Sequence, residues 1–359
     1  MFVVLKFILV FLVLAGLFFP RSKMLFGLTG LYLFLVIGFR TQDVDHYIYQ
    51  VEYATAPFIN YKLADFPGWN LWMNFWIKRG INFNQFLLIM AFISVVLLLV
   101  GIYIIGSKLG GYISFAMSLF LIYPLGHEAT QMRTFFVDAI IVAVLPLLLK
   151  NESNLQKRLV NYLLYFLAVA VATAIHTLAY YFIVVGIIYI IAKSFKYELQ
   201  IIIISSISLI FLINSGILNN LILNFLNTAK QDHWIDNSNF SLGKMVPIII
   251  TLIIWYIATV EINTIRQNVV AEEQISFVNI QKFLNTIFLI LPLMIYDITF
   301  NRLWRIYLLI LYLIMGKYMY GLGTKFSRKR LAVIALFFVM LSIIFVYENE
   351  FNITGDLLI

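Results

Sequence analysis

The sequence predicts an all-α, polytopic membrane protein with about twelve transmembrane helices. Of its 359 residues, 63% are hydrophobic and only 12% are charged, and the mean hydropathy is +0.96. A soluble protein of this length needs a more polar surface than this composition provides. Runs of about 18 apolar residues, each long enough to cross a bilayer as a helix, recur along the chain. Because these runs are continuously apolar rather than alternating, we expect helices and not a closed barrel.

The expected helices follow one another with polar connections between them. We place them at residues 2–19, 24–39, 84–105, 111–126, 133–149, 159–174, 177–193, 198–217, 244–261, 281–299, 303–320 and 328–347. The first apolar run has no small-residue cleavage site before Pro20, so we interpret it as a retained helix and not a signal peptide. Residues 1–359 are therefore expected to form a single integral membrane domain.

Positive charge gathers on alternate connections. One side of the membrane would carry 15 Lys and Arg residues against 5 Asp and Glu, and the other side 9 against 12. Lys and Arg accumulate on the cytoplasmic face, so this pattern predicts that both termini lie outside. We attribute the net charge of +8 to topology and expect no nucleic-acid partner. The chain has no cysteine, which excludes disulfides, thiolate metal sites and cysteine nucleophiles.

Three connections are long enough to stand out. In the outer connection 40–82, a Pro-Gly turn precedes tryptophans at helical spacing, which is typical of an interfacial or re-entrant helix. These tryptophans are Trp69, Trp72 and Trp76. They either anchor the segment in the membrane or line a substrate site. Residues 218–243 are expected to form a second outer loop, and residues 262–281 a cytoplasmic linker.

Four arginines are expected on the outer face, where positive charge is not needed for orientation. They are Arg40, Arg133, Arg302 and Arg305. A planar guanidinium offers paired donors that match phosphate oxygens, so four of them at one depth could hold a lipid-linked pyrophosphate. The alternative is that each arginine pairs with a nearby acid. Such pairs would be Arg40 with Asp45, Arg133 with Glu128, and Arg305 with Asp297.

Two histidines near expected helix ends have both a catalytic and a structural interpretation. If a helix begins at His176, that residue and Tyr180 share a face, and the imidazole could take a proton from a sugar hydroxyl. The same two interpretations apply to His127, which lies in the polar stretch Gly126–Arg133.

The pair Asp43 and Asp45 resembles the Asp-x-Asp pattern of metal-dependent sugar-nucleotide transferases. Nucleotide sugars are cytoplasmic and this pair is expected to face out, which favours a metal-independent role. Asp45 would then orient an acceptor hydroxyl or pair with Arg40. The sequence has no Gly-rich phosphate loop, nucleophile elbow or zinc-spaced histidines, so we expect no cofactor.

Several short motifs follow one another in a recognisable order between residues 38 and 320. They are Gly38-Phe39-Arg40, Asp45 with Tyr47 and Tyr49, Phe66-Pro67-Gly68-Trp69, Gln131-Met132-Arg133, Ala174-Ile175-His176-Thr177, and Asn301-Arg302 before Arg305-Ile306-Tyr307. This order resembles the EpsG family, whose members are similar to Wzy-type O-antigen and polysaccharide polymerases. The chain departs from the family pattern by lacking the glycine before Asp45, by placing an acid at Asp65, and by having Asp138 within an expected helix.

The resemblance implies a bacterial inner-membrane glycosyltransferase of the GT-C-like kind, acting at the outer leaflet. Its partners would be undecaprenyl-pyrophosphate-linked donor and acceptor glycans, membrane lipid and a chain-length regulator, and its product an O-antigen, capsule or exopolysaccharide. The arginines would stabilise the pyrophosphate leaving group. His176 would be the base, with Asp45 or His127 as the alternative. Residues expected to support the acceptor are Tyr180, Glu128, Asp297 and Trp69.

Other functions remain open at this point. A ligase or another glycosyltransferase with a lipid-linked donor needs the same phosphate site. A repeat-unit flippase is a second alternative, although transporters usually show internal repeats and charges near the bilayer midplane. A membrane acyltransferase would use an outer or buried histidine but has less need for four arginines.

Overall fold

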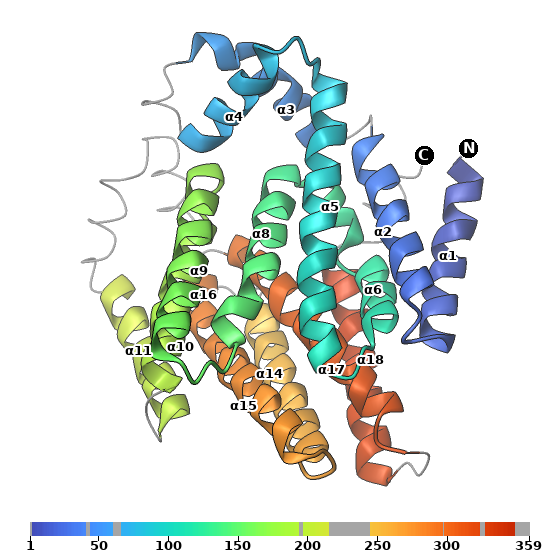
Figure 1. Cartoon of the computed structure of the whole chain (residues 1–359), viewed down its shortest axis with the longest axis vertical. Coiled ribbons are helices and arrows are strands. Elements are labelled where there is room, and N and C mark those ends of the chain that lie inside the picture. The colour runs from blue at the N-terminus through green and yellow to red at the C-terminus, as the bar shows by residue number, and fades with distance from the viewer. Residues whose placement is uncertain are drawn as a thin grey trace. The chain divides into compact units, whose positions relative to one another are not determined.

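The computed structural model describes residues 2–40, 44–59, 66–193, 197–214, 245–296, 298–323 and 327–348 (Figure 1). Within these ranges the chain forms helices joined by turns, with no strand. It separates into two compact units, Met1–Ile183 with Tyr312–Ile359, and Val184–Leu311. The boundaries fall inside α10 (Ala179–Lys193) and α17 (Trp304–Tyr320).

The prediction of a helical, multi-pass membrane protein is confirmed. Six segments of the described residues are helical, long enough and apolar enough to cross a membrane: Phe83–Lys108, Met132–Leu149, Leu155–Ile175, Met245–Arg266, Glu273–Met294 and Arg328–Tyr347. Shorter apolar helices of 10–17 residues accompany them. The expected total of about twelve spans stays a prediction.

The first unit contains most of the helices near the N-terminus together with the last helix. They are α1 (Phe2–Phe18), α2 (Lys23–Gly38), α3 (Val44–Thr55), η1 (Ala56–Phe58), α4 (Pro67–Ile77), α5 (Phe83–Lys108), α6 (Ile113–Ile122), α7 (Leu125–Thr130), α8 (Met132–Leu149), α9 (Leu155–Ile175) and α18 (Arg328–Tyr347). The expected helix 111–126 is therefore divided, because the chain turns at Tyr123 and Pro124 before α7 begins.

Close backbone contact holds the centre of this unit together. A Cβ added to Gly101 of α5 would lie 2.3 Å from the carbonyl oxygen of Val142 on α8. Small residues let membrane helices approach closely enough for their backbones to touch. The start of α5 is fixed by a capping box, in which Asn82 and Gln85 each accept the other's backbone N–H at 3.0 Å.

Arg330 joins α18 to the end of α17 within the first unit. Its guanidinium donates to the carbonyl oxygens of Tyr318, Met319 and Gly323, at distances between 2.6 and 3.2 Å. The last carbonyls of a helix have no partner within that helix. Arg330 therefore satisfies groups that would otherwise be unpaired, and it is itself buried.

The second unit contains the rest of α10 and α17 together with the helices between them. These are α11 (Glu198–Asn214), α14 (Met245–Arg266), α15 (Ala271–Asn285), η3 (Thr286–Leu289), α16 (Ile290–Tyr296) and η4 (Ile298–Leu303). Lys282 of α15 forms an ion pair with Glu198 of α11, with Nζ 2.6 Å from the carboxylate oxygen. The predicted outer loop 218–243 lies outside the described residues.

The expected linker 262–281 is helical over most of its length. Helix α14 continues to Arg266 and α15 begins at Ala271. Its apolar residues Phe277 and Ile280, three positions apart on α15, are buried.

We expect Gly101→Ala to destabilise the protein, because its new methyl group would meet the α8 backbone. Overpacking of this kind costs about 1–3 kcal/mol. Gly27→Ala is the matched control, since nothing lies within 4 Å of a Cβ at that helical position. Thermal unfolding of the two purified variants in one detergent should show a lower midpoint for Gly101→Ala alone. Equal midpoints would contradict the α5–α8 contact.

Candidate functional site

Helices α3 and α4 lie together at one end of α5 and α9 (Figure 1). Helix α2 ends, α5 and α8 begin and α9 ends on this side, and these ends carry most of the first unit's candidate residues. Gly68 explains how α4 reaches α9. A Cβ at this glycine would lie 2.7 Å from the Cβ of Ala174 and 2.8 Å from its carbonyl oxygen. The Pro-Gly turn therefore sets the start of α4 directly beside the residues that precede His176.

Trp69 fixes the two short helices to α5. Its indole is buried and makes edge contacts with Tyr49 of α3 and Phe86 of α5, with ring centroids 6.3 and 5.5 Å away. Tyr53 packs on Phe86 at 4.9 Å, and its hydroxyl donates to the carbonyl oxygen of Ile81 at 2.7 Å. Trp69 thus holds α3 and α4 against α5.

Arg133, in the first turn of α8, is the centre of the polar contacts at this end. Its Nη1 donates to Oε1 of Glu52 at 3.1 Å. Its guanidinium also lies over the rings of Phe66, at 4.3 Å, and Tyr49, at 5.2 Å. The Nε atom is buried and has no hydrogen-bond partner among the described residues. Arg133 pairs with Glu52 and not with Glu128, the partner that chain proximity indicated.

Arg40 approaches Tyr49 from the end of α2. It is buried, its Nη1 donates to the carbonyl oxygen of Ala129, and its guanidinium carbon lies 5.6 Å from the Tyr49 ring. Tyr49 is therefore close to two guanidinium groups. Cations near an aromatic ring gain about 0.5–2 kcal/mol each, which offsets part of the cost of removing them from water.

The Tyr49 hydroxyl is held in its neutral form. Burial raises the pKa of this phenol; Arg133 and Arg40 oppose the shift, and Asp45 adds to it. Asp45 lies one helical turn before Tyr49 in α3, and it is half-buried. At neutral pH Tyr49 can thus donate a hydrogen bond, between two groups that attract anions.

His176 ends α9 with an extended backbone, and α10 begins only at Ala179. His176 and Tyr180 consequently do not share a helical face, and Tyr180 is exposed. The His176 Nδ1 accepts the backbone N–H of Leu178 at 3.1 Å, so the neutral imidazole carries its proton on Nε2. The ring stacks on Phe66, with centroids 5.5 Å apart and planes inclined by 19°.

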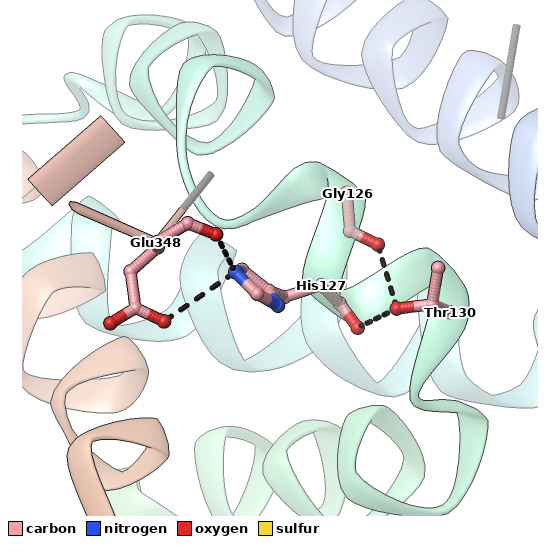
Figure 2. Close-up of polar contacts among 4 residues, drawn as sticks. All are labelled: Gly126, His127, Thr130 and Glu348. Atoms are coloured by element: carbon pink, nitrogen blue, oxygen red, sulfur yellow. Dashed lines mark hydrogen bonds and ion pairs between the residues drawn. The ribbon is translucent and has the colours of Figure 1, made fainter. Parts of the chain in front are cut away.

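The polar stretch 126–133 forms α7 and the first residues of α8. Figure 2 shows that His127 of α7 faces Glu348, which follows α18. Its Nε2 lies 3.0 Å from the backbone oxygen of Glu348 and 3.5 Å from its carboxylate. Thr130 donates to the carbonyl oxygens of Gly126 and His127. His127 thus links α7 to the end of α18, and Glu128 beside it is buried.

The structure gathers only part of the predicted site into one described cluster. Arg40, Asp45 and Arg133 meet around Tyr49, and Phe66 connects Arg133 with His176. The other predicted phosphate ligands, Arg302 and Arg305, belong to the second unit, in η4 and α17. Asp297 lies outside the described residues. In the described part of the chain, no group of three or more His, Cys, Asp or Glu could hold a metal ion.

Glu52 is the residue that the sequence interpretation missed. Asp45, Tyr49 and Glu52 are spaced four and three residues apart, which places them on one face of a helix. That spacing was visible in the sequence. The spacing indicates a shared face only if residues 44–55 are helical. Helix α3 contains few of the apolar residues that identified the other helices, so it was not expected.

Comparison with known proteins gives one clear match. The model of the EpsG family matches residues 23–354, which confirms the resemblance drawn from the motif order. No curated protein and no solved structure matches the chain.

The contact between Gly68 and Ala174 can be tested with a disulfide, because the chain has no cysteine of its own. In Gly68→Cys/Ala174→Cys, a small backbone shift brings the two Cβ atoms into the 3.5–4.5 Å range of a disulfide. We expect rapid cross-linking under mild oxidation, read as a mobility shift on a gel after cleavage between α4 and α9. The control pair Gly68→Cys/Ala168→Cys moves one thiol about 9 Å along α9 and should stay reduced. Failure of the first pair to cross-link would refute the contact.

Proposed function

The chain belongs to the EpsG family, and from this we propose that it is a membrane glycosyltransferase that polymerises oligosaccharide repeat units carried on undecaprenyl pyrophosphate. The family is associated with polysaccharide-polymerase-like membrane proteins. The product would be an O-antigen, a capsule or an exopolysaccharide. The donor and acceptor would both be lipid-linked glycans, and a chain-length regulator would be a further partner.

The same proposal includes the topology. We infer a GT-C-like arrangement of about twelve spans in the bacterial inner membrane, with both termini outside and the site facing outward. Two observations support it: the many apolar helices, and the bias of Lys and Arg towards one set of connections. Under this topology, Arg40 and Arg133 would lie just outside the hydrocarbon core, at the level of the head group of a lipid-linked pyrophosphate.

The observation that carries the proposal is the pair of guanidiniums around Tyr49. Arg40 and Arg133 bring two positive charges to one neutral phenol, and Arg133 forms an ion pair with Glu52. Fixed donors of this kind stabilise the charge that develops on a leaving pyrophosphate. Arg302 and Arg305 remain predicted phosphate ligands on the evidence of the sequence.

The reaction would be a displacement at the anomeric carbon of the donor sugar. An acceptor hydroxyl forms the new glycosidic bond, the bond between the anomeric carbon and the pyrophosphate oxygen breaks, and the arginines stabilise the leaving group. The acceptor hydroxyl must also lose its proton. His176 is the first candidate base from the sequence, with Asp45 and His127 as alternatives, and metal-independent chemistry is part of the proposal.

A strain without this protein separates the proposed reaction from its alternatives. Loss of a polymerase leaves single repeat units attached to the final acceptor. Loss of a ligase makes lipid-linked polymer accumulate, and loss of a flippase keeps repeat units on the inner leaflet. Either of the last two results contradicts the proposal.

Arg133→Ala and Arg302→Ala should each reduce polymer by about 100-fold or more, because each removes a donor to the leaving pyrophosphate. The measurement is the length distribution of cell-surface glycan on a gel, with protein levels checked by immunoblot. Arg79→Ala is the matched control, since Arg79 is exposed and contacts Phe75 of its own segment. Full-length polymer from both test variants would remove the basis for pyrophosphate binding by these arginines.

A further inference from the structure

Glu52 combines two features that the proposed reaction requires of a base. Its Oε1 accepts from Arg133 Nη1 at 3.1 Å, which places the carboxylate beside the proposed phosphate site. Its Oε2 is buried and has no hydrogen-bond partner among the described residues. The side chain as a whole is 30% exposed, so a substrate can contact it once Arg133 releases Oε1.

His176 is less suited to accept a proton. Its Nδ1 lone pair is used by the backbone N–H of Leu178, and the neutral ring then carries hydrogen on Nε2. A ring in this tautomer donates a hydrogen bond and does not remove a proton. Stacking on Phe66, which also contacts Arg133, keeps His176 close to the arginine as a donor.

We propose that Glu52 is the proton acceptor of the glycosyl transfer, and that Arg133 exchanges Glu52 for the donor's pyrophosphate when the site is filled. This proposal rests on the proposed function. With the site empty, the ion pair compensates the charge of Arg133. When phosphate oxygens bind the guanidinium, the Glu52 carboxylate loses its partner and its Oε1 can accept a hydrogen bond from the acceptor hydroxyl.

The step balances without a metal or a further reactant. The acceptor hydroxyl oxygen forms a bond to the anomeric carbon of the donor while that carbon's bond to the pyrophosphate oxygen breaks. The hydroxyl proton passes to Oε1 of Glu52, which Arg133 has released, and the electron pair of the broken bond leaves with the undecaprenyl pyrophosphate. Release of the pyrophosphate lets Glu52 pass its proton to water and pair with Arg133 again.

The test compares binding with turnover in Glu52→Gln. Glutamine keeps the size of the side chain and an oxygen that accepts from Arg133, but it is not a base at neutral pH. Binding is measured with undecaprenyl pyrophosphate added to the purified full-length protein in lipid nanodiscs. Turnover is measured as polymer per cell in the complemented deletion strain. Size-exclusion profiles and unfolding midpoints equal to those of the wild type establish that each variant folds.

We expect Glu52→Gln to lower polymer by about 100-fold or more, which is the usual contribution of a general base. Its affinity for undecaprenyl pyrophosphate should be unchanged or about two- to fivefold tighter, because a partly exposed ion pair no longer competes. Glu52→Asp, which keeps the carboxylate, should restore part of the turnover. Arg133→Ala should weaken binding of the same lipid.

Two results would overturn the role of Glu52 while leaving the proposed function in place. One is polymer within about threefold of wild type in Glu52→Gln, which would place the base elsewhere. The other is joint loss of binding and polymer, which would show that Glu52 only positions Arg133. If the wild-type protein does not bind undecaprenyl pyrophosphate, the proposed phosphate site fails first, and the role of Glu52 fails with it.

Discussion

The docking of α3 and α4 onto the ends of α5 and α9 is the constraint on which the candidate site depends. Trp69 fills the space between α3 and α5, and Gly68 allows α4 to touch the backbone of Ala174. These apolar contacts bring Tyr49, Glu52 and Phe66 to Arg133. Without them the arginine at the start of α8 would have no ion-pair partner among the described residues and no aromatic surface to cover it.

The same contacts explain how charged groups are tolerated in buried positions. A guanidinium removed from water is costly unless its donors are used and its charge is compensated. Arg40 donates to a helix-terminal carbonyl, that of Ala129, and lies near Tyr49. Arg133 has the Glu52 carboxylate and two ring faces, yet its buried Nε has no partner in the described chain. An arginine that is compensated in charge but not fully hydrogen-bonded can exchange its partner for a better one.

Long apolar runs predicted the helical membrane spans, because a span needs such a run and little else. They say less about the residues where the spans end. Residues 262–281 were expected as a linker because of their polar composition, and most of them are helical. His127 finds its partner in Glu348, 221 residues away, and no local pattern indicates that pairing. Glu52 was missed because α3 has too few apolar residues to stand out as a helix.

Arg133 shows why chain proximity is a weak guide to ion pairs near helix starts. Glu128 is five residues away, but it belongs to α7, and the turn at Gln131 begins a new helix between them. Glu52 is 81 residues away and reaches Arg133 because α3 folds back over the end of α8. A carboxylate supplied by a separate short helix can be displaced without disturbing the helix that carries the arginine. The proposed exchange of Glu52 for a phosphate requires the carboxylate and the arginine to be on separate elements. A carboxylate on α8 itself could not move away from Arg133 in this way.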